Sequence, residues 1–189
     1  MKRILLLLVI CIASQAMSFA QTTETKKGGI ESSFIASYYH AFGNVVSTYN
    51  GSTNGVLIGY YGDYVIPNTP VFLGFGLAVG FNTYSKASDS FKNRIIGIPL
   101  TLGFKANISN IVKLKPFMRF MPMYSGYELD KGGQKSAFGG VVPELGAMVT
   151  ISHLVLSCSL GFSWDSYKDP WKYSRLGEFG MNIGVGYKF

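Results

Sequence analysis

Large apolar side chains alternate with small or polar ones along residues 179–189. This period of two is typical of a β-strand with two unlike faces. The apolar face carries Phe179, Met181, Ile183, Val185, Tyr187 and Phe189, and the other face carries Gly180, Asn182, Gly184, Gly186 and Lys188. Because glycine forms only a thin surface, the pattern favours a wall whose apolar face meets lipid and whose small face meets a crowded interior.

The same division recurs in earlier segments of the chain. In residues 71–81 the large side chains are Val71, Leu73, Phe75, Leu77, Val79 and Phe81, with Gly74, Gly76, Ala78 and Gly80 between them. Residues 96–105 and 154–164 repeat it. Alternation of this kind predicts eight strands, each long enough for a tilted membrane crossing of about 9–11 residues. Their ranges are 29–39, 55–65, 70–82, 93–105, 112–124, 138–151, 154–165 and 177–189.

The connections between these strands are alternately long and short. The long, polar ones are 40–54, 83–92, 125–137 and 166–176, and the short ones are 66–69, 106–111 and 152–153. Outer-membrane barrels have long extracellular loops, short periplasmic turns and both termini in the periplasm. The order therefore predicts an all-β fold, an eight-stranded antiparallel up-and-down transmembrane β-barrel. A soluble lipocalin-like barrel is the alternative, but it would turn its large apolar side chains inward.

The amino-terminal 20 residues have the features of a secretory signal peptide. Lys2 and Arg3 precede the apolar run 4–12, and Ser18-Phe19-Ala20 predicts cleavage before Gln21. We therefore expect a signal peptide at 1–20, a short periplasmic segment at 21–28 and a barrel domain at 29–189. Such a chain would be exported to the bacterial outer membrane.

Composition agrees with a membrane barrel and excludes several other classes. The chain is 15% aromatic and only 14% charged, with 23 glycines, an unusual balance for a soluble domain. Cys158 is the one cysteine after the predicted signal peptide, so neither an internal disulfide nor a thiolate metal site is expected. The formal charge of +7 is spread along the chain without a basic run, and no nucleic-acid partner is expected. No cofactor is predicted.

The chain resembles the small eight-stranded outer-membrane proteins typified by OmpX and the membrane domain of OmpA. It is similar in style to the β-barrel-domain outer-membrane proteins of Bacteroidetes. The resemblance rests on Ser18-Phe19-Ala20-Gln21, on Ile98-Pro99-Leu100 and on the ending 184–189. It implies a monomer that contacts outer-membrane lipid and lipopolysaccharide. It also implies that Tyr187 and Phe189 help the barrel-insertion machinery to recognise the last strand; simple interfacial anchoring is the alternative.

Charged residues on the small faces predict ion pairs inside the barrel. Arg119 and Glu144 lie at similar depth on adjacent predicted strands, and an isolated charge in that interior would be costly. Glu31 and Lys188 should meet where the last strand closes on the first. Further inward charges are expected near the periplasmic rim, at Asp63, Lys105, Lys113 and Lys115. Their mixed signs favour mutual neutralisation over a selective pore.

Aromatic residues at the predicted strand ends indicate the two membrane interfaces. The outer set is Tyr38, Tyr39, Tyr84, Tyr124, Tyr127, Trp164 and Tyr167, and the inner set is Tyr60, Tyr64, Phe104, Phe117, Tyr187 and Phe189. Farther out, Trp171, Lys172, Tyr173 and Arg175 form an aromatic and basic group in a predicted loop. This group is a candidate contact surface for an extracellular ligand of unknown identity, or a loop folded on itself.

Evidence for catalysis is sparse in the sequence. His153 occupies a short turn, while His40 lies at the outer end of the first predicted strand and Asp89-Ser90 lies in the second outer loop. The sequence therefore favours a protein without catalytic activity that acts in envelope integrity or surface interaction through its outer loops. The alternatives are an enzyme that modifies lipid A through His40, and a narrow channel.

Overall fold

The computed structural model describes residues 29–44, 52–86, 89–129, 135–168 and 173–189. The strands in these ranges are β1 (Gly29–Asn44), β2 (Ser52–Val65), β3 (Val71–Lys86), β4 (Asp89–Gly97), β5 (Leu100–Phe104), β6 (Ala106–Asn107), β7 (Val112–Leu129), β8 (Lys135–Ile151), β9 (Leu154–Lys168) and β10 (Tyr173–Lys188). No helix in the described part of the chain is long and apolar enough to cross a membrane.

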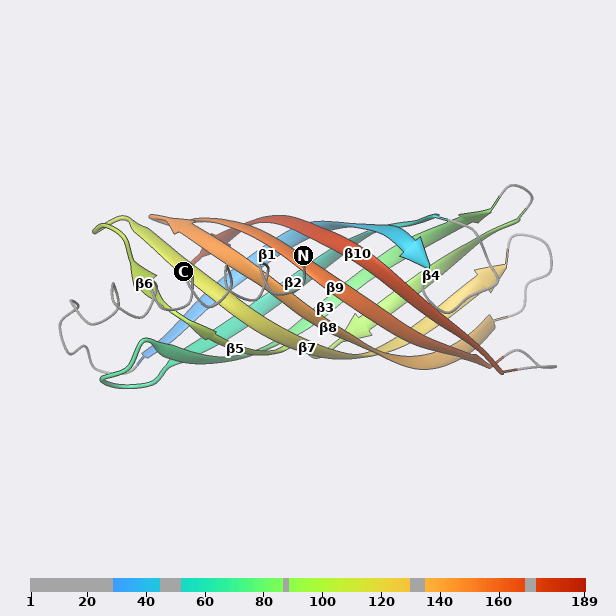
Figure 1. The fold of residues 1–189 in the computed structure, drawn as a ribbon, viewed down its shortest axis with the longest axis horizontal. Helices are drawn as coiled ribbons and strands as arrows, with labels where there is room; N and C mark the ends of the chain where they lie inside the picture. Colours follow the sequence, from blue (N-terminus) through green and yellow to red (C-terminus); the bar gives the residue numbers. More distant parts are fainter. Residues whose placement is uncertain (1–28, 45–51, 87–88, 130–134, 169–172) are drawn as a thin grey trace, which may run out of the picture.

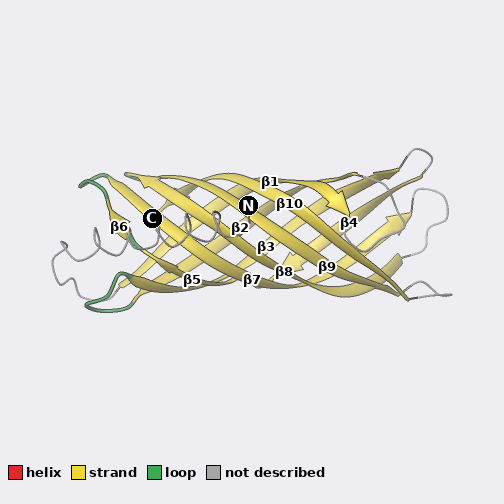
Figure 2. Ribbon diagram, viewed as in Figure 1, coloured by secondary structure: helices red, strands yellow, loops and turns green. Residues whose placement is uncertain are grey.

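The strands form a closed antiparallel ring and are steeply tilted to its axis (Figure 1). We call each strand position in this ring a wall, whether one strand or several short ones fill it. Each wall pairs with the next along the chain, and β10 closes on β1 with Phe34 opposite Tyr187. Because β4 and β5 both pair with β3 and with β7, they act as one wall. Counted in this way, the described ranges make eight walls. The predicted all-β, eight-stranded up-and-down barrel is therefore confirmed, and Figure 2 shows the same ring without helices among the described residues.

The fourth wall is interrupted at Ile98-Pro99, where an unbroken strand was predicted over 93–105. Proline has no N–H to donate to a ladder, and the fully buried Pro99 separates β4 from β5. The Ile98 N–H donates across the break to the carbonyl of Pro122 on β7, at 3.0 Å. Farther along, Ala106 and Asn107 pair with β7 as β6, although they were assigned to a turn.

The strands extend beyond the predicted outer limits. Residues 83–86 pair with 89–92, and only 87–88 separate β3 from β4. The prediction of a long second outer loop over 83–92 was therefore wrong. β1 likewise continues to Asn44, and β9 and β10 pair as far as Lys168 and Tyr173. Backbone pairing continues past the apolar band because it does not depend on apolar side chains. The prediction relied on alternation and ended where alternation ended.

The short connections lie together at the end of the barrel that holds Phe189 (Figure 1). In two of them a non-glycine residue adopts a left-handed backbone, Asn68 with φ 60° and Ser152 with φ 55°. Asparagine tolerates this conformation well. The Ser152 N–H donates to the carbonyl of Ile111, 2.7 Å away, and so ties two of these turns together. The described turns at this end of the barrel are therefore tight and hydrogen-bonded, and we call it the tight-turn end.

The two faces of the wall differ as the alternation predicted. On β3 the side chains of Leu73, Phe75, Leu77, Val79 and Phe81 are 47–59% exposed on the outer face. The lumen holds two apolar clusters, however, and these include large side chains. The cluster nearer the tight turns consists of Ile35, Tyr61, Phe72, Phe117, Met148 and Val155, and the other consists of Leu57, Ala78, Ile95, Met121, Met123 and Val142.

Candidate functional site in the barrel lumen

Inward-facing side chains divide the lumen into charged and apolar layers. β7 contributes to most of these layers, because every second residue of a strand faces the same side. From the tight-turn end inward, it places Lys113, Lys115, Phe117, Arg119 and Met121 along the axis of the barrel. Partners from the other walls complete each layer. The order of residues along β7 therefore sets the order of layers in the lumen.

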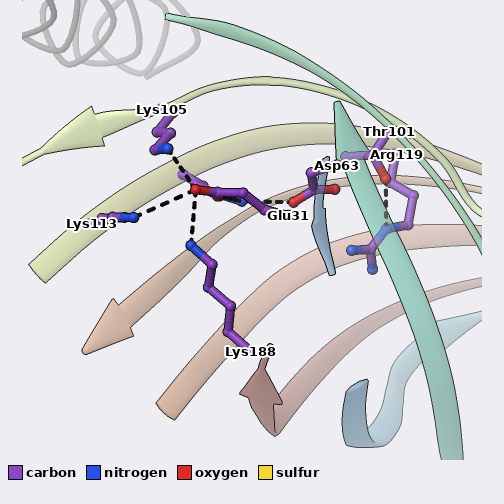
Figure 3. A network of polar contacts seen from close by, with 8 residues as sticks. Glu31, Asp63, Thr101, Lys105, Lys113, Arg119 and Lys188 are labelled. Atoms are coloured by element: carbon purple, nitrogen blue, oxygen red, sulfur yellow. Dashed lines mark hydrogen bonds and ion pairs between the residues drawn. The ribbon is translucent and has the colours of Figure 1, made fainter. Parts of the chain in front are cut away.

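Glu31 lies at the centre of the first layer, which we call the lysine mouth: Glu31, Asp63, Lys105, Lys113, Lys115 and Lys188. Three of its ammonium groups approach the same carboxylate oxygen, Glu31 Oε1, as Figure 3 shows. The distances to that oxygen are 2.6 Å for Lys105, 3.5 Å for Lys113 and 2.9 Å for Lys188. The predicted neighbours Glu31 and Lys188 thus meet at the barrel seam.

Lys115 connects the lysine mouth to the lumen beneath it. Its ammonium group lies 2.8 Å from Glu31 Oε2 and 2.8 Å from Asp63 Oδ2. The same group lies 5.1 Å from the centre of the Phe72 ring. Lys115 is 4% exposed and Phe72 is fully buried. Two carboxylates and an aromatic face therefore compensate the cost of burying this charge.

The next charged layer is the pair formed by Arg119 and Glu144, which lie directly opposite each other on β7 and β8. Arg119 Nη1 donates to Glu144 Oε2 at 3.2 Å, and both side chains are about 5% exposed. Arg119 Nε donates to the hydroxyl of Thr101 at 3.4 Å. The hydroxyl of Ser159 donates to Glu144 Oε2, also at 3.4 Å. The structure thus brings together the two residues predicted to pair in the lumen.

Two aromatic rings enclose the guanidinium group of Arg119. Its carbon lies 4.6 Å from the centre of the Tyr61 ring and 4.5 Å from the centre of the Phe117 ring. A cation over an aromatic face is stabilised by the ring quadrupole, and more so when water is excluded. We call Arg119, Glu144, Tyr61 and Phe117 the lumen plug. The placement of Phe117 at the inner interface was wrong, because its ring faces the lumen.

Beyond the lumen plug lies a mainly apolar cavity with a volume of about 40 Å³. Met121, Met123 and Val142 line it, and Tyr39 contributes to its wall from β1. Tyr39 was assigned to the outer interface, and that assignment was wrong. Alternation alone assigns an aromatic residue to lipid more readily than to the lumen, so sequence reasoning missed the inward rings of Tyr61, Phe72 and Phe117. Their parity with Asp63, Gly74 and Arg119 was the available signal.

The aromatic residues at the carboxyl end form a small outward cluster. The Tyr187 ring stacks on His153 with centroids 5.3 Å apart and meets Phe189 edge-on at 5.4 Å. His153 Nδ1 also lies 2.9 Å from the carbonyl of Lys188. The turn histidine thus supports the end of β10. Tyr187 and Phe189 are 52% and 70% exposed, so both present their rings outward.

The predicted loop contact group divides between described and undescribed residues. Trp171 and Lys172 lie outside the described residues. Tyr173 and Arg175 belong to β10 and pair through their backbones with Lys168 and Ser166, so their assignment to a loop was wrong. Of the side chains in this group the structure describes none.

His40 faces outward near the other end of β1, where it is half-buried. Its Nδ1 lies 2.6 Å from the amide oxygen of Asn54, and the hydroxyl of Tyr38 donates to the same oxygen at 2.8 Å. Asp89 and Ser90 lie on β4, two walls beyond the β2 partner of β1. Within the described ranges, no group of three or more His, Cys, Asp or Glu side chains is placed to hold a metal ion.

No protein-family model matches the chain, and no curated protein matches it. Several solved outer-membrane proteins are similar in structure. Neisserial surface protein A has a TM-score of 0.49 and 18% identity, over 87% of this chain and 100% of that one. The amino-terminal barrel domain of OprF from Pseudomonas aeruginosa has a TM-score of 0.49 and 15% identity, over 86% and 100%. OprG from the same organism has a TM-score of 0.49 and 12% identity, over 85% and 96%.

Proposed function

We propose that this chain is an integral outer-membrane β-barrel protein, monomeric and without catalytic activity, that acts in envelope integrity or surface interaction. The observation that carries this proposal is the contrast between the two faces of the closed wall. The outer face exposes large apolar side chains on wall after wall, while the lumen is filled by ion pairs and packed rings. A closed ring without edges is one of the two ways a backbone can cross lipid.

The outward apolar band is far more than a soluble surface normally carries. Leu145 is 66% exposed on β8, Ile183 is 50% exposed on β10 and Met118 is 55% exposed on β7. Contiguous exposed apolar surface of this kind marks a membrane or partner interface. A lipocalin-like soluble barrel would direct such side chains into its cavity. Outer-membrane lipid and lipopolysaccharide are therefore the proposed surroundings of this band.

The filled lumen argues against the narrow channel. The lysine mouth, the Phe72 layer and the lumen plug follow one another along the axis, and Arg119 and Glu144 are each 5% exposed. Among the described residues, the cavity beyond the lumen plug has a volume of about 40 Å³, room for very few waters. We therefore assign the proposed surface interaction to the end of the barrel opposite the tight turns, where a partner can reach the protein from outside the cell.

The surroundings of His40 argue against the lipid A-modifying alternative. A histidine that acts as a general base is normally oriented by an acid and faces a nucleophile. Here the oriented ring nitrogen faces the amide of Asn54, and Tyr38 competes for the same oxygen. Interfacial anchoring accounts for this trio of outward polar side chains.

Tyr187 and Phe189 support a further part of the proposal, recognition by the barrel-insertion machinery. Both rings are exposed on the outer face of the last strand, and neither contributes to a lumen layer. Replacing both by serine should lower the amount of folded barrel in the membrane while leaving refolding into detergent intact. Equal loss in both assays would indicate anchoring alone.

The proposal as a whole is tested on the purified protein, in planar bilayers and in cells. Purified protein should require detergent and should migrate differently on gels before and after boiling; a protein that stays monodisperse without detergent contradicts the membrane assignment. Planar bilayers should show no discrete conductance steps. Lipid A mass spectra should be identical from cells with and without the protein, whereas cells without it should show altered sensitivity to detergents or altered surface binding.

A further inference from the structure

We propose that the lysine mouth is a binding site for a phosphate group, supplied by a lipid headgroup or by a soluble phosphate. The four ammonium groups of Lys105, Lys113, Lys115 and Lys188 converge there from β7, from β10 and from the end of β5. All of them contact one carboxylate, that of Glu31. Figure 3 labels three of these lysines, Lys105, Lys113 and Lys188, around it. The inference concerns the tight-turn end of the barrel and goes beyond the function proposed for the opposite end.

The first argument is the balance of charge. The lysine mouth contains four ammonium groups and two carboxylates, those of Glu31 and Asp63, and so carries two uncompensated positive charges. Arg119 cannot change this balance, because Glu144 already neutralises it. Uncompensated charge in a partly desolvated site is costly, and a bound anion removes that cost. A phosphate carrying one to two negative charges matches the excess.

The second argument is the number of hydrogen-bond donors. Each ammonium group has three N–H donors and no acceptor. Lys105, Lys113 and Lys188 all approach Glu31 Oε1, a single oxygen with two lone pairs. Most of their donors therefore remain available for a further acceptor. A phosphate group offers several strong acceptor oxygens, which a monodentate ligand such as chloride does not.

The third argument is access from the end of the barrel. The side chains of Lys105 and Lys188 are 16% and 15% exposed, and that of Lys113 is 27% exposed. Lys115 is enclosed at 5%. The cavity beside it, lined by Ser33, Thr150 and Glu31 among others, has a volume of about 10 Å³, which holds at most one water. A phosphate must therefore cap the mouth from outside, on Lys113, Lys105 and Lys188.

The test measures phosphate binding by folded protein in an uncharged maltoside detergent at constant ionic strength, by equilibrium dialysis of labelled inorganic phosphate. Lys113→Gln removes the most exposed ammonium group of the lysine mouth. The affinity of this variant for inorganic phosphate should be about fivefold lower than that of the wild type. Lys92→Gln is the matched control, because Lys92 is an exposed lysine on β4 and belongs to no part of the lysine mouth. Each variant is first checked for the heat-modifiable shift of a folded barrel.

Glu31→Gln provides a test of opposite sign. Removing this carboxylate leaves three positive charges in excess, so a folded Glu31→Gln variant should bind phosphate more tightly than the wild type. A purely structural network predicts weaker or unchanged binding instead. If Glu31→Gln does not fold, Asp63→Asn takes its place with the same expected direction, because it also removes one negative charge from the lysine mouth.

A second arm identifies the source of the phosphate. Native mass spectrometry of protein extracted from membranes would count retained phosphatidylglycerol in the wild type, Lys113→Gln and Lys92→Gln. Lipid lost only from Lys113→Gln, without binding of inorganic phosphate, identifies a headgroup; the reverse identifies a soluble phosphate. The proposal is overturned if neither binds, if Lys92→Gln loses as much as Lys113→Gln, or if the folded carboxylate variant binds no more tightly than the wild type.

Discussion

Arg119 and Glu144 face each other across adjacent strands in the middle of the lumen, 3.2 Å apart and each 5% exposed. They are direct partners in the β7–β8 register, so their contact is fixed by backbone pairing as well as by charge. Tyr61 and Phe117 cover the guanidinium group on two sides. This arrangement makes the pair a closed unit, and its energetics can be measured.

Neutralising either member of the pair should destabilise the barrel more than neutralising both. Glu144→Gln leaves a buried guanidinium uncompensated, and breaking a buried pair costs about 3–5 kcal/mol. The double variant Arg119→Met/Glu144→Gln removes both charges, so its loss should be smaller than the sum of the single losses by at least about 1 kcal/mol. Urea unfolding from lipid vesicles measures the free energy of unfolding of Glu144→Gln, Arg119→Met and the double variant. Strict additivity of the two single losses would count against the pair.

Phe117 should matter more than its outward neighbour Phe120. Phe117→Leu removes the ring beneath Arg119, which we expect to lower the free energy of unfolding by about 1–3 kcal/mol through lost cation–π attraction and lost packing. Phe120→Leu on the same strand changes a side chain that is 46% exposed and should cost less than about 1 kcal/mol. Equal losses in vesicle unfolding would show that the lumen ring has no special role.

Gly103 should not tolerate a methyl group. A Cβ at this position would lie 2.5 Å from the carbonyl oxygen of Pro116 and 2.6 Å from the Phe72 ring. The backbone and the buried ring cannot both move away, so Gly103→Ala should cost about 1–3 kcal/mol. Gly62→Ala is the control, because there the nearest atoms are 3.7 Å away and belong to Phe75. The prediction is wrong if the two variants unfold at the same urea concentration.

Cys158 offers a direct test of the membrane assignment. It is exposed on the outer face of β9, between Leu156 and Leu160. In lipid nanodiscs an apolar maleimide should label it, whereas a sulfonated maleimide should not, because lipid covers the thiol. A Cys158→Ser/Asn110→Cys variant carries its thiol in an exposed turn and should react with both reagents. Equal reaction of Cys158 with the sulfonated reagent would contradict a lipid-facing wall.

Local pattern was enough to predict the lumen plug's ion pair. Arg119 and Glu144 each occupy the small face of their strand, and counting from the intervening loop placed them at equal depth. Glu31 and Lys188 followed from the same counting across the seam. Both predictions needed only a period of two and an antiparallel neighbour, which are properties of adjacent segments.

The individual partners of these charges across the lumen were beyond that reasoning, although mutual neutralisation near the rim was expected. Lys105 and Lys113 meet Glu31 only because the ring closes and brings distant walls to one mouth, at sequence separations of 74 and 82 residues. Phe72 and Phe117 were not expected inside, since an apolar ring can face either lipid or a packed interior. The break at Pro99 was also missed, because alternation of apolar residues continues through it while the backbone ladder does not.

The sequence by itself determined the barrel wall: its succession of strands, its two faces and the neighbours within it. These follow from the period of two, which backbone geometry imposes on every strand. The tertiary structure alone decided how the lumen is filled, with three ammonium groups on one oxygen and two rings around one guanidinium. The reason is physical: inward side chains meet partners from across the whole ring, and no single pair of adjacent strands contains those contacts.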